Sequence, residues 1–139
     1  MNKIVSVIIP THSGHDTIVK TLESVLNQSY TNLEIIICDD NGENTQNQLL
    51  TQKAVEPLLK KDKRIKYIIS KENKNGSSAR NIAMRASHGE YISFLDDDDE
   101  YMRECIQKEV ETFERLDDEY GIVFVNHSQV SRHKKAQFL

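Results

Sequence analysis

The chain has 139 residues, of which 37% are hydrophobic and 29% charged, and it carries a net charge of −4. This composition is typical of one globular domain with its own core, and it excludes a disordered chain. The positive charges are scattered, so we expect no nucleic-acid partner. The apolar runs are too short to cross a bilayer, so we expect no transmembrane segment, and the first run lacks the basic leader of a signal peptide.

The first forty residues predict a strand, a helix and a second strand. Two nearly continuous apolar runs, Ile4–Pro10 and Leu33–Asp39, are typical of strands covered on both faces. Between them, residues 16–28 predict a helix with Asp16 as its N-cap and with one apolar face made of Ile18, Val19, Leu22, Val25 and Leu26. Such a unit joins two parallel strands through a crossover helix.

The alternation of helices and strands continues along the chain. Pro57 lies inside the next predicted helix and should kink or split it. The remaining predicted elements are a helix over 43–61, strands over 64–70, 90–95 and 121–127, a loop and short helix over 73–89 that ends near Gly89, and a helix over 102–116. This order predicts an α/β doubly wound, mostly parallel sheet with helices on both faces, in a single domain over residues 1–139.

Polar side chains gather where the predicted strands end. The strands are followed by the sequences PTHSGH, DDNGEN, SKENKNGSSAR and DDDDEY. In an open parallel sheet, ligands bind beyond the carboxyl ends of the strands. We therefore expect the functional site at this edge. It would not be a dinucleotide or P-loop cradle, since neither glycine motif is present.

The four aspartates of residues 96–99 are the strongest candidate for a metal site. Clustered carboxylates select Mg²⁺ or Mn²⁺, which often bind through one or two carboxylates together with phosphates. If the strand continues, Asp96 and Asp98 point to one side and Asp97 to the other. The alternative is an acidic turn that caps a helix starting at Met102. The spacing does not fit an EF-hand loop.

Three further residues at the strand ends have two possible readings each. Asp39 and Asp40 can accept hydrogen bonds from a base or a ribose, or they can form an Asp-Asn-Gly turn that leads to a helix. Arg80 can pair with a diphosphate, or it can be an ordinary surface arginine.

The two cysteines, Cys38 and Cys105, lack metal-type partners and predict free thiols in a reducing compartment.

Two blocks of this sequence resemble the N-terminal half of family 2 glycosyltransferases. The first is VSVIIPTHSGHDTIVKTLESVLNQSYTNLEIIICDDNGE, and the second is NGSSARNIAMRASHGEYISFLDDDDEY. Together they run from about Ile4 to Tyr101. The resemblance implies a GT-A fold and an enzyme that uses a nucleotide-diphospho-sugar.

The resemblance also implies a role for each matching position. Pro10 and Thr11 would line the base through backbone groups, and Asp40 would hold the base, usually uracil, with Asp39 as the alternative. Arg80 would lie at the diphosphate. In the DxD motif, Asp98 would bind Mn²⁺ or Mg²⁺ directly, and Asp96 or Asp97 would reach the ribose or a metal-bound water. The chain departs from the family at His12-Ser13, at the Asn41-Gly42 pair of the DDNG block, and at Ala83.

The activity implied is inverting, metal-dependent transfer of a sugar, usually from a UDP-sugar, to an acceptor hydroxyl. The family's common setting is cell-envelope or capsular polysaccharide synthesis, which implies a cytoplasmic location or one at the inner face of the membrane. The acceptor, a saccharide or a lipid-linked one, is not indicated. We expect the general base and the acceptor site to lie beyond Leu139, and we expect exposed apolar surface that favours a homo-oligomer.

Two other functions are compatible with parts of the pattern. A truncated, non-catalytic module would bind a nucleotide-sugar without transferring it. A receiver-like signalling domain would use the acidic pair of Asp39 and Asp40, but it would leave the aspartates of residues 96–99 unexplained.

Overall fold

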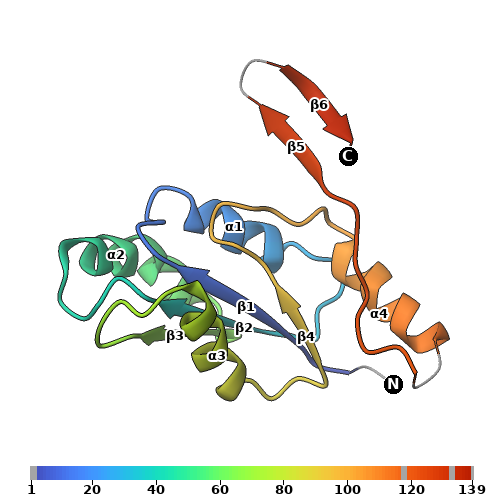
Figure 1. The fold of residues 1–139 in the computed structure, drawn as a ribbon, viewed down its shortest axis with the longest axis horizontal. Helices are drawn as coiled ribbons and strands as arrows, with labels where there is room; N and C mark the ends of the chain where they lie inside the picture. The colour runs from blue at the N-terminus through green and yellow to red at the C-terminus, as the bar shows by residue number, and fades with distance from the viewer. Residues whose placement is uncertain (1–2, 117–118, 132–133, 139) are drawn as a thin grey trace.

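The computed structural model describes residues 3–116, 119–131 and 134–138, and it contains a parallel sheet of four strands (Figure 1). The order across the sheet is β3-β2-β1-β4, and neighbouring strands are all parallel. The strands are β1 (Val5–Thr11), β2 (Leu33–Asp39), β3 (Ile65–Ile69) and β4 (Tyr91–Phe94). The predicted α/β class and its first four strands are therefore confirmed.

Helices cover both faces of this sheet. They are α1 (Ile18–Leu26), α2 (Gln46–Lys61), α3 (Gly76–Arg85) and α4 (Cys105–Arg115). Side chains of α1, α2 and α4 pack in one core cluster with Val7, Ile9 and Ile35, whereas Ala79 and Ala83 of α3 pack on the opposite face against Ile8 and Ile36. Alternate residues of β1 and β2 thus enter different cores, which explains why both strands read as continuous apolar runs.

The predicted N-cap of the first helix is wrong, and the split that was one of two expected effects of Pro57 is absent. Thr17, not Asp16, occupies the N-cap position of α1, and no side chain caps this end. The α2 helix runs unbroken past Pro57, so the proline does not split it. Pro57 and Lys53 are both exposed, so water can bond the carbonyl that the proline leaves without a donor.

The predicted fifth strand is also wrong. Residues 121–127 form no regular structure, and Ile122 and Phe124 are 69% and 88% exposed. The strands that follow, β5 (Ser128–Ser131) and β6 (Lys134–Phe138), pair antiparallel with each other in a hairpin that stands away from the main sheet (Figure 1). A β-rich sequence becomes a strand only where a neighbouring strand pairs with it, and 121–127 has no such neighbour among the described residues.

Candidate functional site

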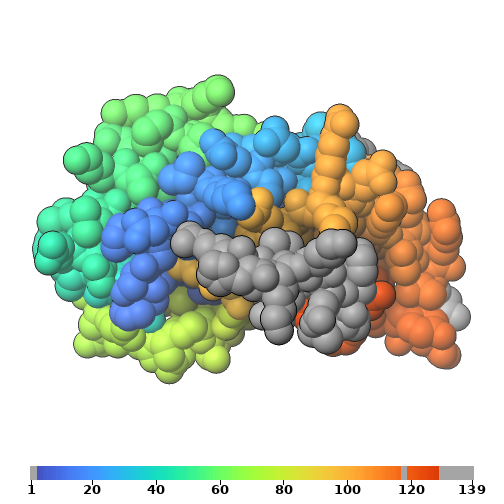
Figure 2. Space-filling model, turned by 90° about the horizontal axis from the view of Figure 1, so that it is seen from above, coloured from blue at the N-terminus to red at the C-terminus, as the bar shows by residue number. Residues whose placement is uncertain are grey.

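The segments that follow the four parallel strands meet at one edge of the sheet. The register places Thr11 beside Asp39, and the Asp40 N–H donates to the Thr11 carbonyl at 2.9 Å. The Ser70 N–H donates to the Asp39 carbonyl at 2.8 Å. On the space-filling surface, the loop after β1 (blue) lies beside the segments after β2 (teal) and β3 (yellow-green) (Figure 2). The expected gathering of polar strand ends is therefore present.

The acidic segment after β4 forms a turn rather than an extension of the strand. The strand ends at Phe94, and the Asp99 N–H donates to the Asp96 carbonyl at 3.1 Å. The strand does not continue, so the condition on which the aspartates were expected to alternate in direction is not met. Asp98 is exposed and forms no hydrogen bond or ion pair with the part of the chain that the structure describes. Asp96 accepts a hydrogen bond from Arg80, which projects from α3.

Asp97 is directed toward the loop after β1. Its Oδ2 accepts a hydrogen bond from Thr11 Oγ1 at 2.5 Å and one from the His12 N–H at 3.3 Å. Burial raises the pKa of this carboxyl group, the two hydrogen bonds oppose that rise, and the neighbouring charges of Asp98 and Asp96 add to it. The direct contact between Asp97 and the loop after β1 follows from the turn and could not be read from the sequence.

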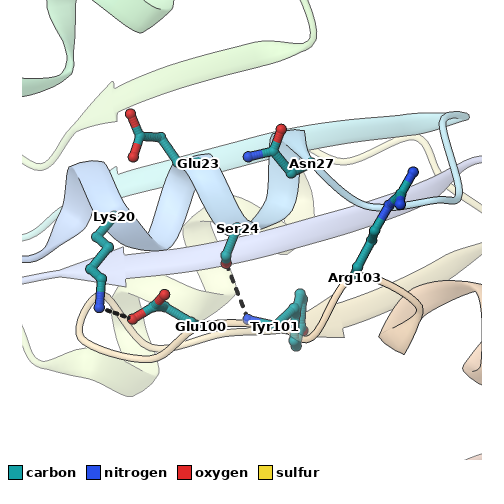
Figure 3. Close-up of a pocket in the computed structure, with 7 residues that line it drawn as sticks. All are labelled: Lys20, Glu23, Ser24, Asn27, Glu100, Tyr101 and Arg103. Carbon is teal, nitrogen blue, oxygen red and sulfur yellow. Dashed lines mark hydrogen bonds and ion pairs between the residues drawn. The ribbon is translucent and has the colours of Figure 1, made fainter.

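The acidic turn does not cap the following helix. The α4 helix begins at Cys105 with Glu104 at its N-cap, and no side chain caps it. The predicted start at Met102 is therefore too early. Between turn and helix, the chain is attached to the outer face of α1, where Lys20 pairs with Glu100 at 2.6 Å and Ser24 Oγ accepts from the Tyr101 N–H at 3.1 Å (Figure 3).

The two aspartates at the end of β2 are buried and have different partners. Asp39 accepts from the backbone and side-chain N–H groups of Asn41, at 2.9 and 2.7 Å, and from the Tyr67 hydroxyl. Asp40 reaches across to the third strand end, where its Oδ2 accepts from the N–H groups of Lys74 and Asn75 at 3.1 and 2.8 Å. Among the described residues, its Oδ1 accepts only from the Lys74 N–H, at 3.1 Å. Oδ1 of Asp40 therefore keeps a free lone pair, because a carboxylate oxygen can accept two hydrogen bonds.

Three asparagines join these segments, and the sequence did not single them out. Asn41 Oδ1 accepts from the Ser13 N–H at 2.7 Å, and Asn73 Nδ2 lies 2.9 Å from His12 Nδ1. Asn75 has a φ of 125° and caps α3 by accepting from the Ser78 N–H at 2.9 Å. Only the last contact has a sequence signal, an asparagine three residues before a serine at a helix start.

The carboxylates of the turn fit a divalent cation that arrives with further ligands. Within the described ranges, no three His, Cys, Asp or Glu side chains are grouped closely enough to hold a metal ion by themselves. Asp98 and Asp96 instead offer exposed, hard oxygen donors. One or two carboxylates completed by phosphate oxygens and waters is a usual arrangement for Mg²⁺ and Mn²⁺.

The two cysteines are not part of this site. Both cysteines are free thiols, with Cys38 buried in β2 and Cys105 half-buried at the start of α4. Burial raises the pKa of each thiol to about 11, which makes both poor nucleophiles.

Among the helices that the structure describes, none is long and apolar enough to cross a membrane.

Comparison with known proteins shows the family of the chain as a whole. Residues 6–138 match the family described as glycosyl transferase family 2. The chain belongs to this family.

Curated members of glycosyl transferase family 2 resemble the chain over most of its length. It is 31% identical to the amylovoran biosynthesis glycosyltransferase AmsB of Erwinia amylovora, over 96% of this chain and 44% of that protein. It is 38% identical to the UDP-Glc:alpha-D-GlcNAc-diphosphoundecaprenol beta-1,3-glucosyltransferase WfaP of Escherichia coli, over 81% of this chain and 42% of that protein. The chain thus spans less than half the length of these family members.

Solved structures support the same fold. The structure of S. aureus TarS in complex with UDP-GlcNAc matches with a TM-score of 0.68 and 26% identity, over 79% of this chain and 31% of that one. A mannosyltransferase from Pyrobaculum calidifontis, solved with GDP-Man and Mn²⁺, matches with a TM-score of 0.61 and 25% identity, over 70% and 28%. The GT-A fold expected for a family 2 glycosyltransferase is therefore confirmed.

Proposed function

We propose that residues 1–139 form a single domain that binds a nucleotide-diphospho-sugar, namely a UDP-sugar, and that this domain belongs to an inverting, metal-dependent glycosyltransferase. The observation that carries the proposal is the meeting of Asp40, Arg80 and the exposed Asp98 at one edge of the sheet. Support comes from the family, from TarS, which was solved with UDP-GlcNAc, and from WfaP, whose name specifies UDP-Glc.

The base is proposed to lie between the loop after β1 and the segment after β2. Pro10 and Thr11 would line it through backbone groups, and a carboxylate would accept from the base edge. Of the two candidates, Asp40 is preferred over Asp39, because its Oδ1 has one hydrogen-bond donor and a free lone pair. A single hydrogen bond to a charged group contributes about 1.5–3 kcal/mol.

The diphosphate is proposed to lie between α3 and the acidic turn. Arg80 would bind phosphate oxygens with its forked guanidinium group. Asp98 and Asp96 would hold Mn²⁺ or Mg²⁺, in keeping with the Mn²⁺ named in the mannosyltransferase structure. Of the two aspartates considered for the ribose or a metal-bound water, Asp96 is preferred, because the Asp97 carboxylate is directed toward Thr11.

These residues would act mainly on the leaving group. As the bond from the sugar to the diphosphate breaks, negative charge grows on the departing phosphate, and Arg80 places a fixed positive charge beside it. A bound divalent ion supplies Lewis-acid stabilisation of the same charge. Asp40 and the backbone of Thr11 would fix the nucleotide and so orient the anomeric carbon for one direct displacement, which inverts its configuration.

The acceptor is proposed to be a saccharide hydroxyl, on a free or lipid-linked chain, in the synthesis of a cell-surface polysaccharide. The names of AmsB, with amylovoran biosynthesis, and WfaP, with a diphosphoundecaprenol acceptor, support this setting. The two free thiols support a reducing cytoplasmic location, with a lipid-linked acceptor reached at the inner face of the membrane.

A homo-oligomer is proposed at the free edge of β4. Ile92 and Phe94 of this strand are 43% and 49% exposed, and the neighbouring residues 120–125 add further apolar surface. Exposed apolar side chains on an edge strand favour association. Sedimentation velocity of the purified chain tests this, and a monomer at all concentrations contradicts it.

Isothermal titration calorimetry with UDP tests the donor site. We expect binding with Mn²⁺ and loss of binding in EDTA, and we expect Asp98→Asn to lose most of the affinity. Glu100→Gln is the matched control, since Glu100 lies two residues away and pairs with Lys20 on α1. Equally tight UDP binding in EDTA contradicts the metal site. Incubation with radiolabelled UDP-sugars and saccharide acceptors then distinguishes a transferase from a module that binds without transfer.

A further inference from the structure

We propose that Asp97 is a positioning residue that fastens the loop after β1 to the acidic turn, and that it is not a ligand of the metal or the nucleotide. This inference rests on the proposed function, because it assigns a role to each aspartate of the proposed donor site. It gives Asp97 a different role from those of Asp96 and Asp98.

The contacts of Asp97 connect the first and last strand ends of the site. One carboxylate oxygen, Oδ2, accepts from Thr11 Oγ1 at 2.5 Å and from the His12 N–H at 3.3 Å. The Asp97 carbonyl also accepts from Thr21 Oγ1 of α1, at 2.9 Å. Both the side chain and the backbone of Asp97 are thus held by the β1–α1 unit, whereas Asp98 next to it is exposed.

Gly14 provides the space that the Asp97 carboxylate occupies. A Cβ atom at Gly14 would lie 1.9 Å from Asp97 Oδ2 and 2.6 Å from its Cγ, and 2.7 Å from Thr11 Oγ1. Carbon and oxygen atoms cannot approach this closely without displacement. The missing side chain of Gly14, in the loop after β1, therefore makes room for the Asp97 carboxylate of the acidic turn.

This arrangement links the two ends of the proposed donor site. Thr11, the last residue of β1, is proposed to line the base, and Asp97 lies between the two carboxylates proposed to hold the metal. The Asp97 carboxylate is half-buried and hydrogen-bonded to Thr11, and this fixes the position of the turn that carries Asp96 and Asp98. Burial also raises the pKa of Asp97. We therefore expect Asp97 to act through the placement of Asp96 and Asp98.

Four variants separate positioning from ligation. Asp97→Asn keeps an acceptor oxygen for Thr11 Oγ1 and the His12 N–H, so its Mn²⁺-dependent affinity for UDP should fall by no more than about threefold. Asp97→Ala and Thr11→Val each break the side-chain bond and should weaken UDP by about tenfold, which is the effect of one hydrogen bond at a charged group. Asp98→Asn, a change of the same chemistry at a proposed ligand, should lose most of the affinity.

The double variant Thr11→Val with Asp97→Ala should bind UDP no more weakly than Asp97→Ala alone, because Asp97→Ala already breaks the contact that Thr11→Val removes. Two results overturn the proposal. The first is a loss for Asp97→Asn as large as that for Asp98→Asn, since a metal ligand needs its charge. The second is a normal UDP affinity for Thr11→Val, since the contact would then not matter.

A second measurement keeps the inference testable if the wild-type chain binds no UDP. Thermal unfolding without ligand should show that Gly14→Ala is destabilising in the wild type and clearly less so in an Asp97→Ala background, where only the Thr11 contact remains. Equal destabilisation in both backgrounds overturns the contact between Gly14 and Asp97. Absence of UDP binding with normal coupling between the two positions instead refutes the proposed function alone.

Discussion

The Arg80 guanidinium group donates a hydrogen bond to the Asp96 carboxylate and thereby joins α3 to the turn that follows β4. The side chains are 35% and 54% exposed, so the pair contributes at most about 1 kcal/mol to stability. A bound diphosphate can therefore pair with Arg80, and a bound cation with Asp96, because breaking the ion pair costs little free energy. The ion pair keeps the two groups in place at the proposed phosphate site.

The first prediction concerns Arg80. Arg80→Ala should weaken UDP by about tenfold or more and leave uridine, which has no phosphate, unchanged, because the guanidinium group acts on phosphate oxygens. Arg85→Ala is the control, since Arg85 is an exposed arginine in the last turn of the same helix. Calorimetry with both ligands measures this, and equal losses for UDP and uridine would argue that Arg80 only supports the fold.

The second prediction concerns Asp40. Asp40→Ala should weaken UDP by roughly ten- to a hundredfold and pyrophosphate by much less, because a carboxylate at the base edge cannot matter to a ligand without a base. The same carboxylate also holds the N–H groups of Lys74 and Asn75, so the variant should unfold at a lower temperature.

A variant of Asn75 controls for this loosening of the loop. Asn75→Gly removes the side-chain cap of α3 but suits the φ of 125°, so it should perturb the same segment while leaving Asp40 intact. If Asn75→Gly weakens UDP as much as Asp40→Ala does, then Asp40 holds the loop and not the base. Titration of both variants with UDP and pyrophosphate distinguishes these cases.

The sequence predicted the parts of this fold that depend on burial. The strands β1 and β2 are nearly continuous apolar runs because each face packs against helices, and this pattern is visible without a structure. Residues 121–127 have the same β-rich composition, but whether they form a strand depends on a pairing partner, and composition does not reveal one.

The site was predicted at the level of strand ends but not of single atoms. Parallel strands bring their carboxyl ends together, so a shared edge for Asp40 and Asp98 followed from topology. The direction of Asp97 depends instead on the turn that begins as soon as β4 ends at Phe94. The bridge from Asn41 to Ser13 depends on the left-handed φ of 59° at Ser13. Local backbone choices of this kind leave no periodic signal.

The third prediction concerns the pH dependence of stability at Glu34, at the opposite edge of the sheet. Burial alone would raise the pKa of Glu34, but hydrogen bonds from the His88 N–H, from Ser6 Oγ and from the Gly89 N–H outweigh it, and the pKa is lowered. A carboxyl group with a lowered pKa in the folded state stabilises the fold above its ordinary pKa, and this contribution is lost as the pH falls through the folded-state value.

Glu34→Gln should therefore lower the free energy of unfolding by about 1 kcal/mol at pH 7, a figure discounted for partial exposure. The difference from the wild type should shrink as the pH falls below about 4.5, the ordinary value for glutamate. Urea unfolding at several pH values measures this. Glu23→Gln, at an exposed position of α1, is the control, and a Glu34→Gln deficit that stays constant down to pH 3 would contradict the assignment.

The fourth prediction concerns Gly89, which lies between α3 and β4 and sets where the edge strand begins. A Cβ atom at this position would lie 2.7 Å from the Ser6 N and 2.8 Å from the Ile4 carbonyl oxygen, both backbone atoms of the first strand region, and 2.4 Å from Ser6 Oγ. Backbone atoms of a central strand cannot move aside cheaply. Gly89→Ala should therefore destabilise the protein by about 1–3 kcal/mol. It should also weaken the binding of UDP, because a shift of β4 moves the acidic turn at its other end.

Gly121→Ala is the matched control, since nothing lies within 4 Å of a Cβ there, and its effect on stability should stay within about 0.5 kcal/mol. Urea unfolding and UDP calorimetry on both variants test this pair of expectations. A Gly89→Ala protein as stable as the Gly121→Ala protein would mean that β4 is not packed against β1 as closely as the backbone contacts require.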